Sequence, residues 1–210
     1  MRFPAALLVF ALMLPILSVS ALPKVGSEAP VVRAVSYDGK ALSTTSLRGK
    51  VVVLMFVAEW CPHCREELPA LSTAWREYGL EREGIIGIVM MVSSGESKAL
   101  EFFNSVNPPS NWKLVLAGED TARDFGVSGV PTTVVIDGNW TVSGVFVGAQ
   151  PPDRVLEPVV RLSGQLTSTT QISQAEESSL NSGLPIAVAL VTVLVLSGLY
   201  YYARRYRRRK

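Results

Sequence analysis

Two cysteines separated by two residues are the part of this sequence whose side chains could do chemistry together. Cys61 and Cys64 are the only cysteines in the 210 residues, and the only histidine, His63, lies between them. A pair of thiols at this spacing can close into a disulfide and reopen by exchange with another disulfide. The apolar run Val51–Val57 precedes the pair, and a helix-like sequence follows it from Arg65. A CxxC motif at a strand-to-helix junction predicts thiol–disulfide exchange.

The two thiols have different expected roles, because a helix is predicted to begin at the motif. Cys61 would lie at the helix N-terminus, where unpaired N–H groups and the positive end of the helix dipole favour a thiolate, so we expect it to be the nucleophile. Cys64, one turn further on, would be more buried and would resolve the mixed disulfide. Pro62 suits the first helical turn, which needs no N–H donor. His63 should lower the pKa of the Cys61 thiol further, which would make the disulfide more oxidising, and a side chain that simply points to solvent is the alternative.

Two other interpretations of the motif compete with redox chemistry. A purely structural disulfide is disfavoured, because a bridge that closes so few residues removes little loop entropy from the unfolded chain. A metal site with Cys61, His63 and Cys64 as ligands lacks the further cysteine or histidine that a structural zinc site needs. The sequence therefore favours a redox-active pair without metal or cofactor, and a metal-handling or redox-inactive binding module is the alternative.

The elements that must position the pair predict an α/β domain, with a central mixed sheet flanked by helices. Apolar runs rich in β-branched residues at 50–57 and 84–92 predict strands that are buried on both faces. Pro69 falls inside the helix that follows the motif and should kink it. Right-handed crossovers are expected for the parallel units. In chain order we expect strands at 31–35, 50–57, 84–92, 112–116, 132–136 and 141–147, and helices at 61–81, 97–106, 120–125 and 153–162.

The N-terminal end differs in composition from the middle of the chain. Residues 1–21 combine Arg2, a short apolar run and small residues suited to cleavage, which predicts a secretory signal peptide, with an uncleaved anchor as the alternative. One folded domain is expected at 22–164. A flexible stalk rich in Ser, Thr and Gln is expected at 165–183.

The C-terminal end predicts a membrane anchor. Residues 184–203 carry no charged side chain, and as a helix they would span the roughly 30 Å bilayer core. The tail at 204–210 consists almost entirely of Arg and Lys, which the positive-inside rule places in the cytoplasm. We therefore expect a single-pass protein of the cell membrane whose folded domain lies outside the cytoplasm.

The formal charge of +2 hides an acidic external part of the chain. Of the 20 Lys and Arg residues, Arg2 and the six in the tail 204–210 lie at the ends, which leaves 13 against 18 Asp and Glu in the expected external part, a net charge of −5. The external part therefore lacks the basic composition that is typical of nucleic-acid binding. An oxidising exterior would allow the disulfide to persist.

The sequence at 56–64, Phe-Val-Ala-Glu-Trp-Cys-Pro-His-Cys, resembles the active-site strand and loop of the thioredoxin superfamily. The wider pattern resembles the TlpA/ResA-like, membrane-anchored branch, which is close to the AhpC/TSA-type domains. The resemblance covers about residues 23–162 and implies a thioredoxin fold with thiol–disulfide oxidoreductase activity. The other matching segments are 25–30, 38–40, 47–50 and 64–69.

The resemblance also implies roles for residues outside the cysteine pair. Val130 and Pro131 match the family's cis-proline loop, which faces the CxxC motif and pairs with the substrate backbone; an ordinary turn is the alternative. Trp60 and Pro62 would lie beside the bound substrate, although packing in the core is the alternative for Trp60. Glu67, three residues after the second cysteine, matches a glutamate that tunes the thiols and relays protons, with a solvated helix residue as the alternative.

Two departures from the family pattern leave the direction of electron flow open. Met55 stands where thioredoxin has a buried aspartate, which makes Glu67 the better candidate for a proton relay. The Pro62-His63 pair is that of the oxidant DsbA, whereas the surrounding sequence resembles reductases.

The sequence thus predicts a membrane-tethered, extracytoplasmic thiol–disulfide oxidoreductase. Its partners would be protein disulfides or dithiols and a redox partner in the membrane or outside the cytoplasm, without nucleic acid. Asn139-Trp140-Thr141 is an N-glycosylation sequon in an expected hairpin turn, so Asn139 is a candidate modification site.

Overall fold

The computed structural model describes residues 21–92, 94–116, 118–165, 193–197, 199–200 and 205. The chain divides into two units, residues 1–163 and 164–210, and the first contains both β-sheets. The expected signal peptide and most of the expected stalk, membrane span and basic tail lie outside the described residues. Within the part of the chain that is described, no helix is long and apolar enough to cross a membrane.

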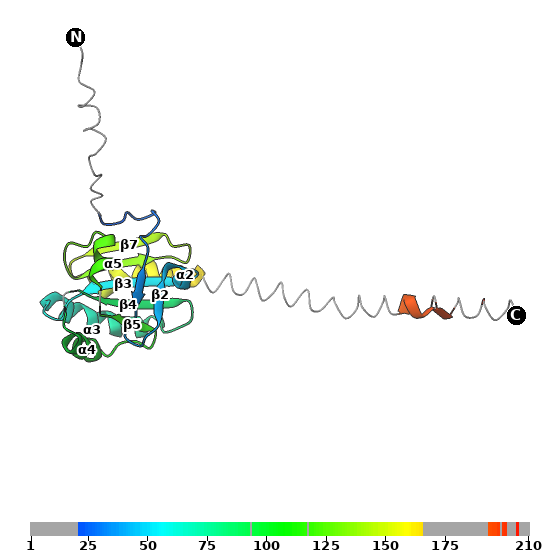
Figure 1. The fold of residues 1–210 in the computed structure, drawn as a ribbon, viewed down its shortest axis with the longest axis horizontal. Coiled ribbons are helices and arrows are strands. Elements are labelled where there is room, and N and C mark those ends of the chain that lie inside the picture. Colours follow the sequence, from blue (N-terminus) through cyan, green and yellow to red (C-terminus); the bar gives the residue numbers. More distant parts are fainter. Residues whose placement is uncertain are drawn as a thin grey trace, which may run out of the picture. The chain divides into compact units, whose positions relative to one another are not determined.

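The centre of the folded domain is a five-stranded sheet in the order β5-β4-β3-β6-β7 (Figure 1). β3 (Val51–Val57) is parallel to β4 (Ile85–Met91), and β4 is parallel to β5 (Trp112–Val115). On the other side of β3, β6 (Thr132–Ile136) is antiparallel to it, and β7 (Val142–Val147) is antiparallel to β6. This mixed sheet, with helices packed around it, confirms the predicted α/β class.

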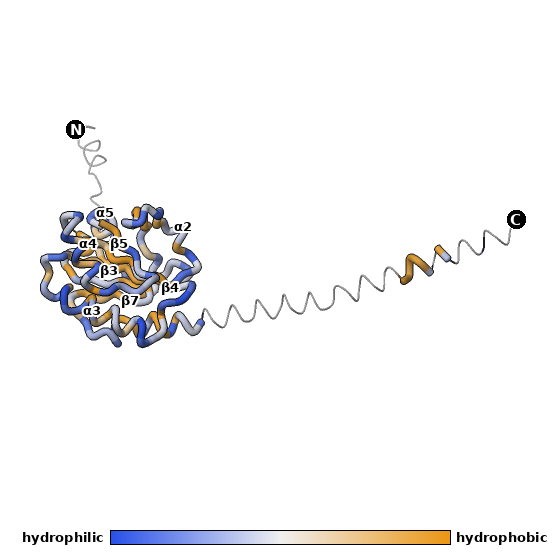
Figure 2. The backbone as a smooth tube through the Cα atoms, turned by 90° about the horizontal axis from the view of Figure 1, so that it is seen from below, coloured by the Kyte–Doolittle hydropathy of each residue, from blue (hydrophilic) through white to orange (hydrophobic). Residues whose placement is uncertain are grey.

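β3 occupies the centre of the sheet because its sequence can be buried on both faces. All seven of its residues are buried, and it pairs with β4 on one side and β6 on the other. A continuous apolar run of this kind fits a strand that is covered on both faces. Figure 2 shows the hydrophobic colour gathered on the strands, inside a largely hydrophilic exterior. The chain therefore leaves a rigid strand at Val57, four residues before Cys61.

Helices join the strands of the sheet. α3 (Pro62–Glu77) connects β3 to β4, α4 (Glu96–Ser105) connects β4 to β5, and α5 (Glu119–Asp124) precedes β6. Residues 152–165 form a last helix after β7. The sequence predicted each of these helices to within a few residues. Each helix is either long enough to show a periodic spacing of apolar residues or has clear boundary residues.

The end of α3 differs from the prediction. The helix was expected to reach about residue 81, but it ends at Glu77, and the chain turns at Gly79, whose φ of +63° is in the left-handed region. Glycine adopts this conformation without a steric penalty and commonly ends helices. Pro69 lies inside α3, as predicted.

A small β-hairpin stands apart from the main sheet. The strand expected at 31–35 is β1 (Arg33–Val35), and it pairs antiparallel with β2 (Ala41–Ser43). The one-turn helix α2 (Thr44–Leu47) follows directly. The sequence prediction missed β2 and α2 because segments of three or four residues are too short to show a periodic pattern.

Candidate active site

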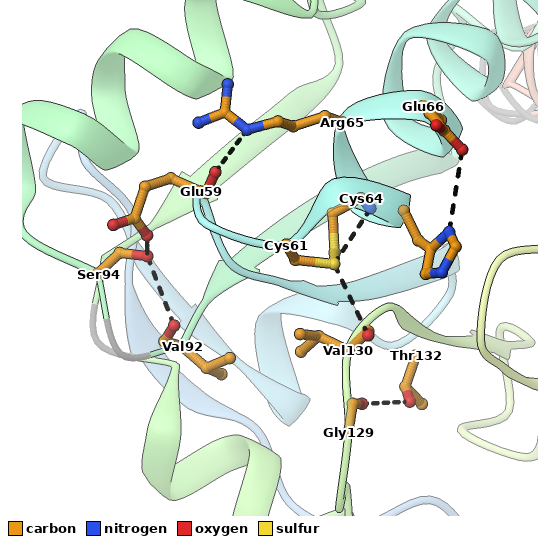
Figure 3. The surroundings of a disulfide bond; sticks show 11 residues. Glu59, Cys61, Cys64, Arg65, Glu66, Val92, Ser94, Gly129, Val130 and Thr132 are labelled. Atoms are coloured by element: carbon orange, nitrogen blue, oxygen red, sulfur yellow. Dashed lines mark hydrogen bonds and ion pairs between the residues drawn. A yellow bond between two sulfur atoms is a disulfide. The ribbon is translucent and has the colours of Figure 1, made fainter.

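The cysteine pair lies where β3 passes into α3 (Figure 3). Cys61 is the N-cap residue of α3, and Pro62 occupies the first turn, where no N–H donor is needed. The Cys61 N–H donates to the carbonyl oxygen of Ala58 at 3.1 Å, which closes the loop between strand and helix. The N–H of Cys64 donates to the Sγ atom of Cys61 at 3.1 Å. The first turn of α3 thus directs a backbone donor at the Cys61 sulfur.

Cys61 and Cys64 form a disulfide, with their Cα atoms 5.3 Å apart. Cys61 is 3% exposed, whereas Cys64 is 0% exposed. Only Cys61 therefore keeps accessible surface, as expected if it is the thiol that meets another protein's sulfur. The predicted order of burial is confirmed.

The loop before β6 faces the disulfide from the opposite side. The Val130–Pro131 peptide bond is cis, as the resemblance implies. The carbonyl oxygen of Val130 lies 3.7 Å from Cys61 Sγ (Figure 3). After reduction, the Cys61 thiol can donate to this oxygen, a contact that favours the thiol, whereas the N–H at the start of α3 favours the thiolate. The two contacts act on one sulfur in opposite directions.

Trp60 projects from the surface next to Cys61. It is 59% exposed, which contradicts the alternative of an aromatic packed in the core. One hollow of about 400 Å³ lies between Trp60, α5 and the loop that ends at Val130. A second hollow of about 350 Å³ lies between Trp60 and α4. Trp60 lines both hollows, and both therefore open beside the disulfide.

His63 faces solvent within the first turn of α3. Its side chain is 71% exposed, and its Nδ1 atom lies 3.9 Å from Oε2 of Glu66, which is itself exposed. The structure thus places the imidazole beside a carboxylate rather than packed into the protein. Any influence of His63 on the Cys61 thiolate would act through space and would weaken as salt is added.

Glu67 is buried on α3, three residues after Cys64. The residue is 5% exposed, and its Oε1 atom accepts a hydrogen bond from the backbone N–H of Gln150 at 3.3 Å. Its Oε2 atom is buried and has no partner among the described residues. Desolvation raises the pKa of Glu67 to about 7, although the Gln150 bond opposes this shift. The solvated-helix alternative is therefore wrong, whereas the neighbouring Glu66 is exposed.

Glu59 is a second buried acid, and the sequence analysis missed it. Its carboxylate accepts a short hydrogen bond from Ser94 Oγ, in the loop after β4. This bond, more than any other contact, lowers the pKa of Glu59, so the carboxylate stays charged. Arg65 Nε donates to the backbone carbonyl of Glu59 at 2.8 Å (Figure 3). Nothing local in the sequence indicates these contacts, because Ser94 lies 35 residues from Glu59.

The described residues do not assemble a cluster of metal ligands. Within them, no group of three or more His, Cys, Asp or Glu side chains could hold a metal ion. The sulfurs of Cys61 and Cys64 are bonded to each other. Met55, at the position of the thioredoxin aspartate, is buried in β3 and carries no ionisable group. The segment 59–67 thus combines a disulfide with two buried acids, Glu59 and Glu67.

The burial of Glu67 predicts that the stability of the oxidised protein depends on pH. A carboxyl group whose pKa rises from 4.5 to about 7 on folding stabilises the fold below pH 4.5, and this contribution is lost as the pH rises through 7. At ~1.4 kcal/mol per pKa unit, the loss is about 3 kcal/mol. Urea unfolding at about pH 5 and about pH 8 should therefore show less loss of stability in Glu67→Gln than in the wild type.

Glu66→Gln is the matched control, because Glu66 lies next to Glu67 and its side chain is 79% exposed. We expect this variant to keep the pH dependence of the wild type. If the stability of Glu67→Gln falls with pH as steeply as that of the wild type, Glu67 ionises normally in the folded protein and the argument from burial is wrong.

Comparison with known proteins agrees with this site. A model of the Redoxin family matches residues 24–160. Thiol:disulfide interchange protein HelX of Rhodobacter capsulatus is 34% identical over 136 residues, which cover 64% of this chain and 74% of HelX. Thiol-disulfide oxidoreductase ResA of Bacillus subtilis is 29% identical over 124 residues, which cover 59% of this chain and 67% of ResA.

Solved structures give the same result for the fold. The crystal structure of a putative thiol:disulfide interchange protein DsbE from Chlorobium tepidum superposes with a TM-score of 0.56 at 26% identity. The superposition covers 68% of this chain and 98% of that one. The sheet, the disulfide at the start of α3 and the facing cis-proline loop all lie within residues 24–160, which the Redoxin model matches. The chain therefore belongs to the Redoxin family, within the TlpA/ResA-like group of thioredoxin-fold thiol–disulfide oxidoreductases.

Proposed function

We propose that this chain is an extracytoplasmic, membrane-tethered oxidoreductase that exchanges electrons with protein disulfides and dithiols through Cys61 and Cys64. The observation that carries the proposal is the position of Cys61 Sγ. It belongs to the more exposed residue of the pair, it accepts a hydrogen bond from an N–H in the first turn of α3, and it faces the carbonyl of Val130. A sulfur in this position can both attack another disulfide and be attacked.

In the reducing direction the exchange takes two steps. The Cys61 thiolate attacks one sulfur of a substrate disulfide, the substrate S–S bond breaks, and the departing substrate thiolate takes up a proton. The product is a mixed disulfide between Cys61 and the substrate. The Cys64 thiolate then attacks Cys61 Sγ, which releases the second substrate thiol and leaves the Cys61–Cys64 disulfide. Oxidation of a substrate dithiol is the reverse sequence.

Glu67 is the group that we assign to proton transfer at Cys64. Cys64 must lose its proton before it can attack the mixed disulfide, and it has no exposed surface through which water could accept that proton. Glu67 is a buried acid on the same helix, and its pKa of about 7 allows it to accept and release a proton near neutral pH. His63, outside on the first turn, is assigned to electrostatic support of the Cys61 thiolate.

The substrate chain is proposed to bind across the exposed surface around Cys61. Trp60 supplies an exposed aromatic face beside the sulfur. Pro62 is exposed at the start of α3, and Val130 lies opposite with its carbonyl directed toward Cys61. Pro131 is buried behind it and fixes the course of this loop. These four residues surround the one sulfur that a partner can approach.

Membrane attachment is supported by the sequence alone. The secretory-type segment 1–21 would direct the domain out of the cytoplasm, the apolar segment 184–203 would anchor it, and the basic tail 204–210 would remain inside. The stalk at 165–183 would give the domain reach toward protein substrates and a redox partner near the membrane. Asn139, which is exposed in the turn between β6 and β7, is available for glycosylation where the host has that machinery.

Cysteine variants test the catalytic proposal. Cys64→Ser should accumulate a mixed disulfide with insulin or a peptide disulfide, visible by mass spectrometry and reversed by dithiothreitol, because Cys61 attacks and nothing resolves. Cys61→Ser should form no such adduct, and turnover of insulin should fall by about a thousand-fold or more in both variants. Insulin reduction by Cys61→Ser at the wild-type rate would contradict the proposal, and so would a redox-inactive wild type.

Truncation tests the membrane anchor. In a host that processes secretory signals, the full chain should sediment with membranes and resist alkaline washing. A chain that ends at residue 183 should be released in soluble form with its disulfide exchange intact, because the folded domain precedes that point. If the full chain is washed free without detergent, segment 184–203 does not anchor the protein.

A further inference from the structure

The hollow between Trp60 and α4 is lined by several charged side chains. It has a volume of about 350 Å³, and its charged side chains are Glu59, Arg65, Lys98 and Glu101. We call it the charged hollow. Arg65 immediately follows Cys64 in α3, and Trp60 immediately precedes Cys61, so the charged hollow and the reactive sulfur belong to one short segment. A chain that covers Cys61 can therefore reach both.

Arg65 is held in place before any ligand arrives. Its Nε atom donates to the carbonyl oxygen of Glu59 at 2.8 Å, and its guanidinium carbon lies 5.7 Å from the ring centroid of Phe102. The guanidinium group is planar. The contact with the aromatic ring and the hydrogen bond of Nε therefore also fix the orientation of its two terminal nitrogens. Among the described residues, Arg65 forms no ion pair with a carboxylate. It is a preorganised donor without an anionic partner.

The carboxylate of Glu59 does not supply that partner. It already accepts a hydrogen bond from Ser94 Oγ. This bond joins the loop after β4 to the active-site loop. Lys98, on the exposed side of α4, is the second cation of the charged hollow, and its charge helps to lower the pKa of Glu59. Glu101, also exposed on α4, is a further carboxylate of the charged hollow that could compete for the cations.

We propose that the charged hollow is a specificity site that receives an acidic side chain of the protein substrate while the substrate's sulfur lies at Cys61. The inference rests on the proposed disulfide exchange and adds a preference to it. Arg65 is the principal partner of the incoming carboxylate, because a fixed guanidinium can offer two parallel N–H donors to it. Lys98 contributes a second, less directional charge.

The overall charge of the domain would produce the opposite preference. Residues 22–164 carry 13 basic and 16 acidic side chains, a net charge of −3, so long-range attraction favours cationic substrates. A preference for acidic substrates would therefore report a local site rather than the general field. This opposition makes the inference testable by comparing two peptides of opposite charge.

The test uses the full chain with Cys64→Ser, in its reduced form, and two peptides. Each peptide carries one cysteine in a mixed disulfide with thionitrobenzoate, flanked on both sides by either glutamates or lysines. Cys61 attacks the peptide sulfur, the peptide–thionitrobenzoate bond breaks, and the thionitrobenzoate anion is released and measured by its absorbance. The ratio of the two second-order rate constants, glutamate over lysine, is the readout. The ratio is insensitive to changes in Cys61 reactivity, because such changes affect both peptides equally.

We expect a ratio of about five to ten at low salt, which should fall toward one as salt is added. Arg65→Gln should lower the ratio at least about three-fold, Lys98→Gln should lower it less, and Glu101→Gln should raise it. Arg82→Gln is the matched control, because this exposed arginine lies near Lys50, at the opposite end of β3 from the disulfide. It should leave the ratio unchanged.

Two results would overturn the inference while leaving the proposed function intact. One is a ratio of one or less when both peptides react rapidly. The other is a ratio that Arg65→Gln lowers no more than Arg82→Gln does. If neither peptide reacts with the folded protein, although both react with the urea-unfolded protein, the proposed disulfide exchange itself fails, and the specificity site fails with it.

Discussion

The hydrogen bond from the Cys64 N–H to Cys61 Sγ is the interaction on which the rest of this structure depends. It exists only if a helix begins at Cys61, and the helix begins there because the buried strand β3 ends four residues earlier and Pro62 can start a helix. The 3.1 Å contact places the positive end of α3 at the sulfur that must carry negative charge during exchange. The central sheet thus determines where the N-terminus of α3 lies and toward which atom its N–H groups point.

Two groups next to the Cys61 sulfur have opposite effects on its protonation, and protonation decides whether the sulfur can attack a disulfide. The carbonyl of Val130, 3.7 Å away, favours the protonated thiol, while the helix terminus favours the thiolate. A substrate that takes over the Val130 carbonyl as a hydrogen-bond acceptor would remove the first influence and leave the second. Glu67, buried on α3 three residues after Cys64 and with a raised pKa, is the group proposed to exchange a proton with the more buried thiol.

Much of this arrangement could be predicted from sequence because it is local. The CxxC motif, the apolar run of β3 and the start of α3 are consecutive, and the cis bond before Pro131 followed from family resemblance. What could not be predicted depends on contacts across the chain. Glu67 accepts a hydrogen bond from Gln150, 83 residues away, so its spacing on the helix could not predict its surroundings. The hydrogen bond between Glu59 and Ser94 and the cation–π contact of Arg65 with Phe102 arise because the fold brings α4 and the loop before it against the active-site loop.

The reduction potential of the Cys61–Cys64 couple tests the central claim most directly. Equilibration of the protein with glutathione or dithiothreitol buffers, followed by alkylation and mass spectrometry, gives the fraction reduced at each potential. A redox-active pair at a helix N-terminus should titrate reversibly with two electrons, between about −270 mV, as in thioredoxin, and about −120 mV, as in DsbA. The position within that range would assign the direction of electron flow. A potential below about −300 mV, typical of a structural disulfide, would contradict the account.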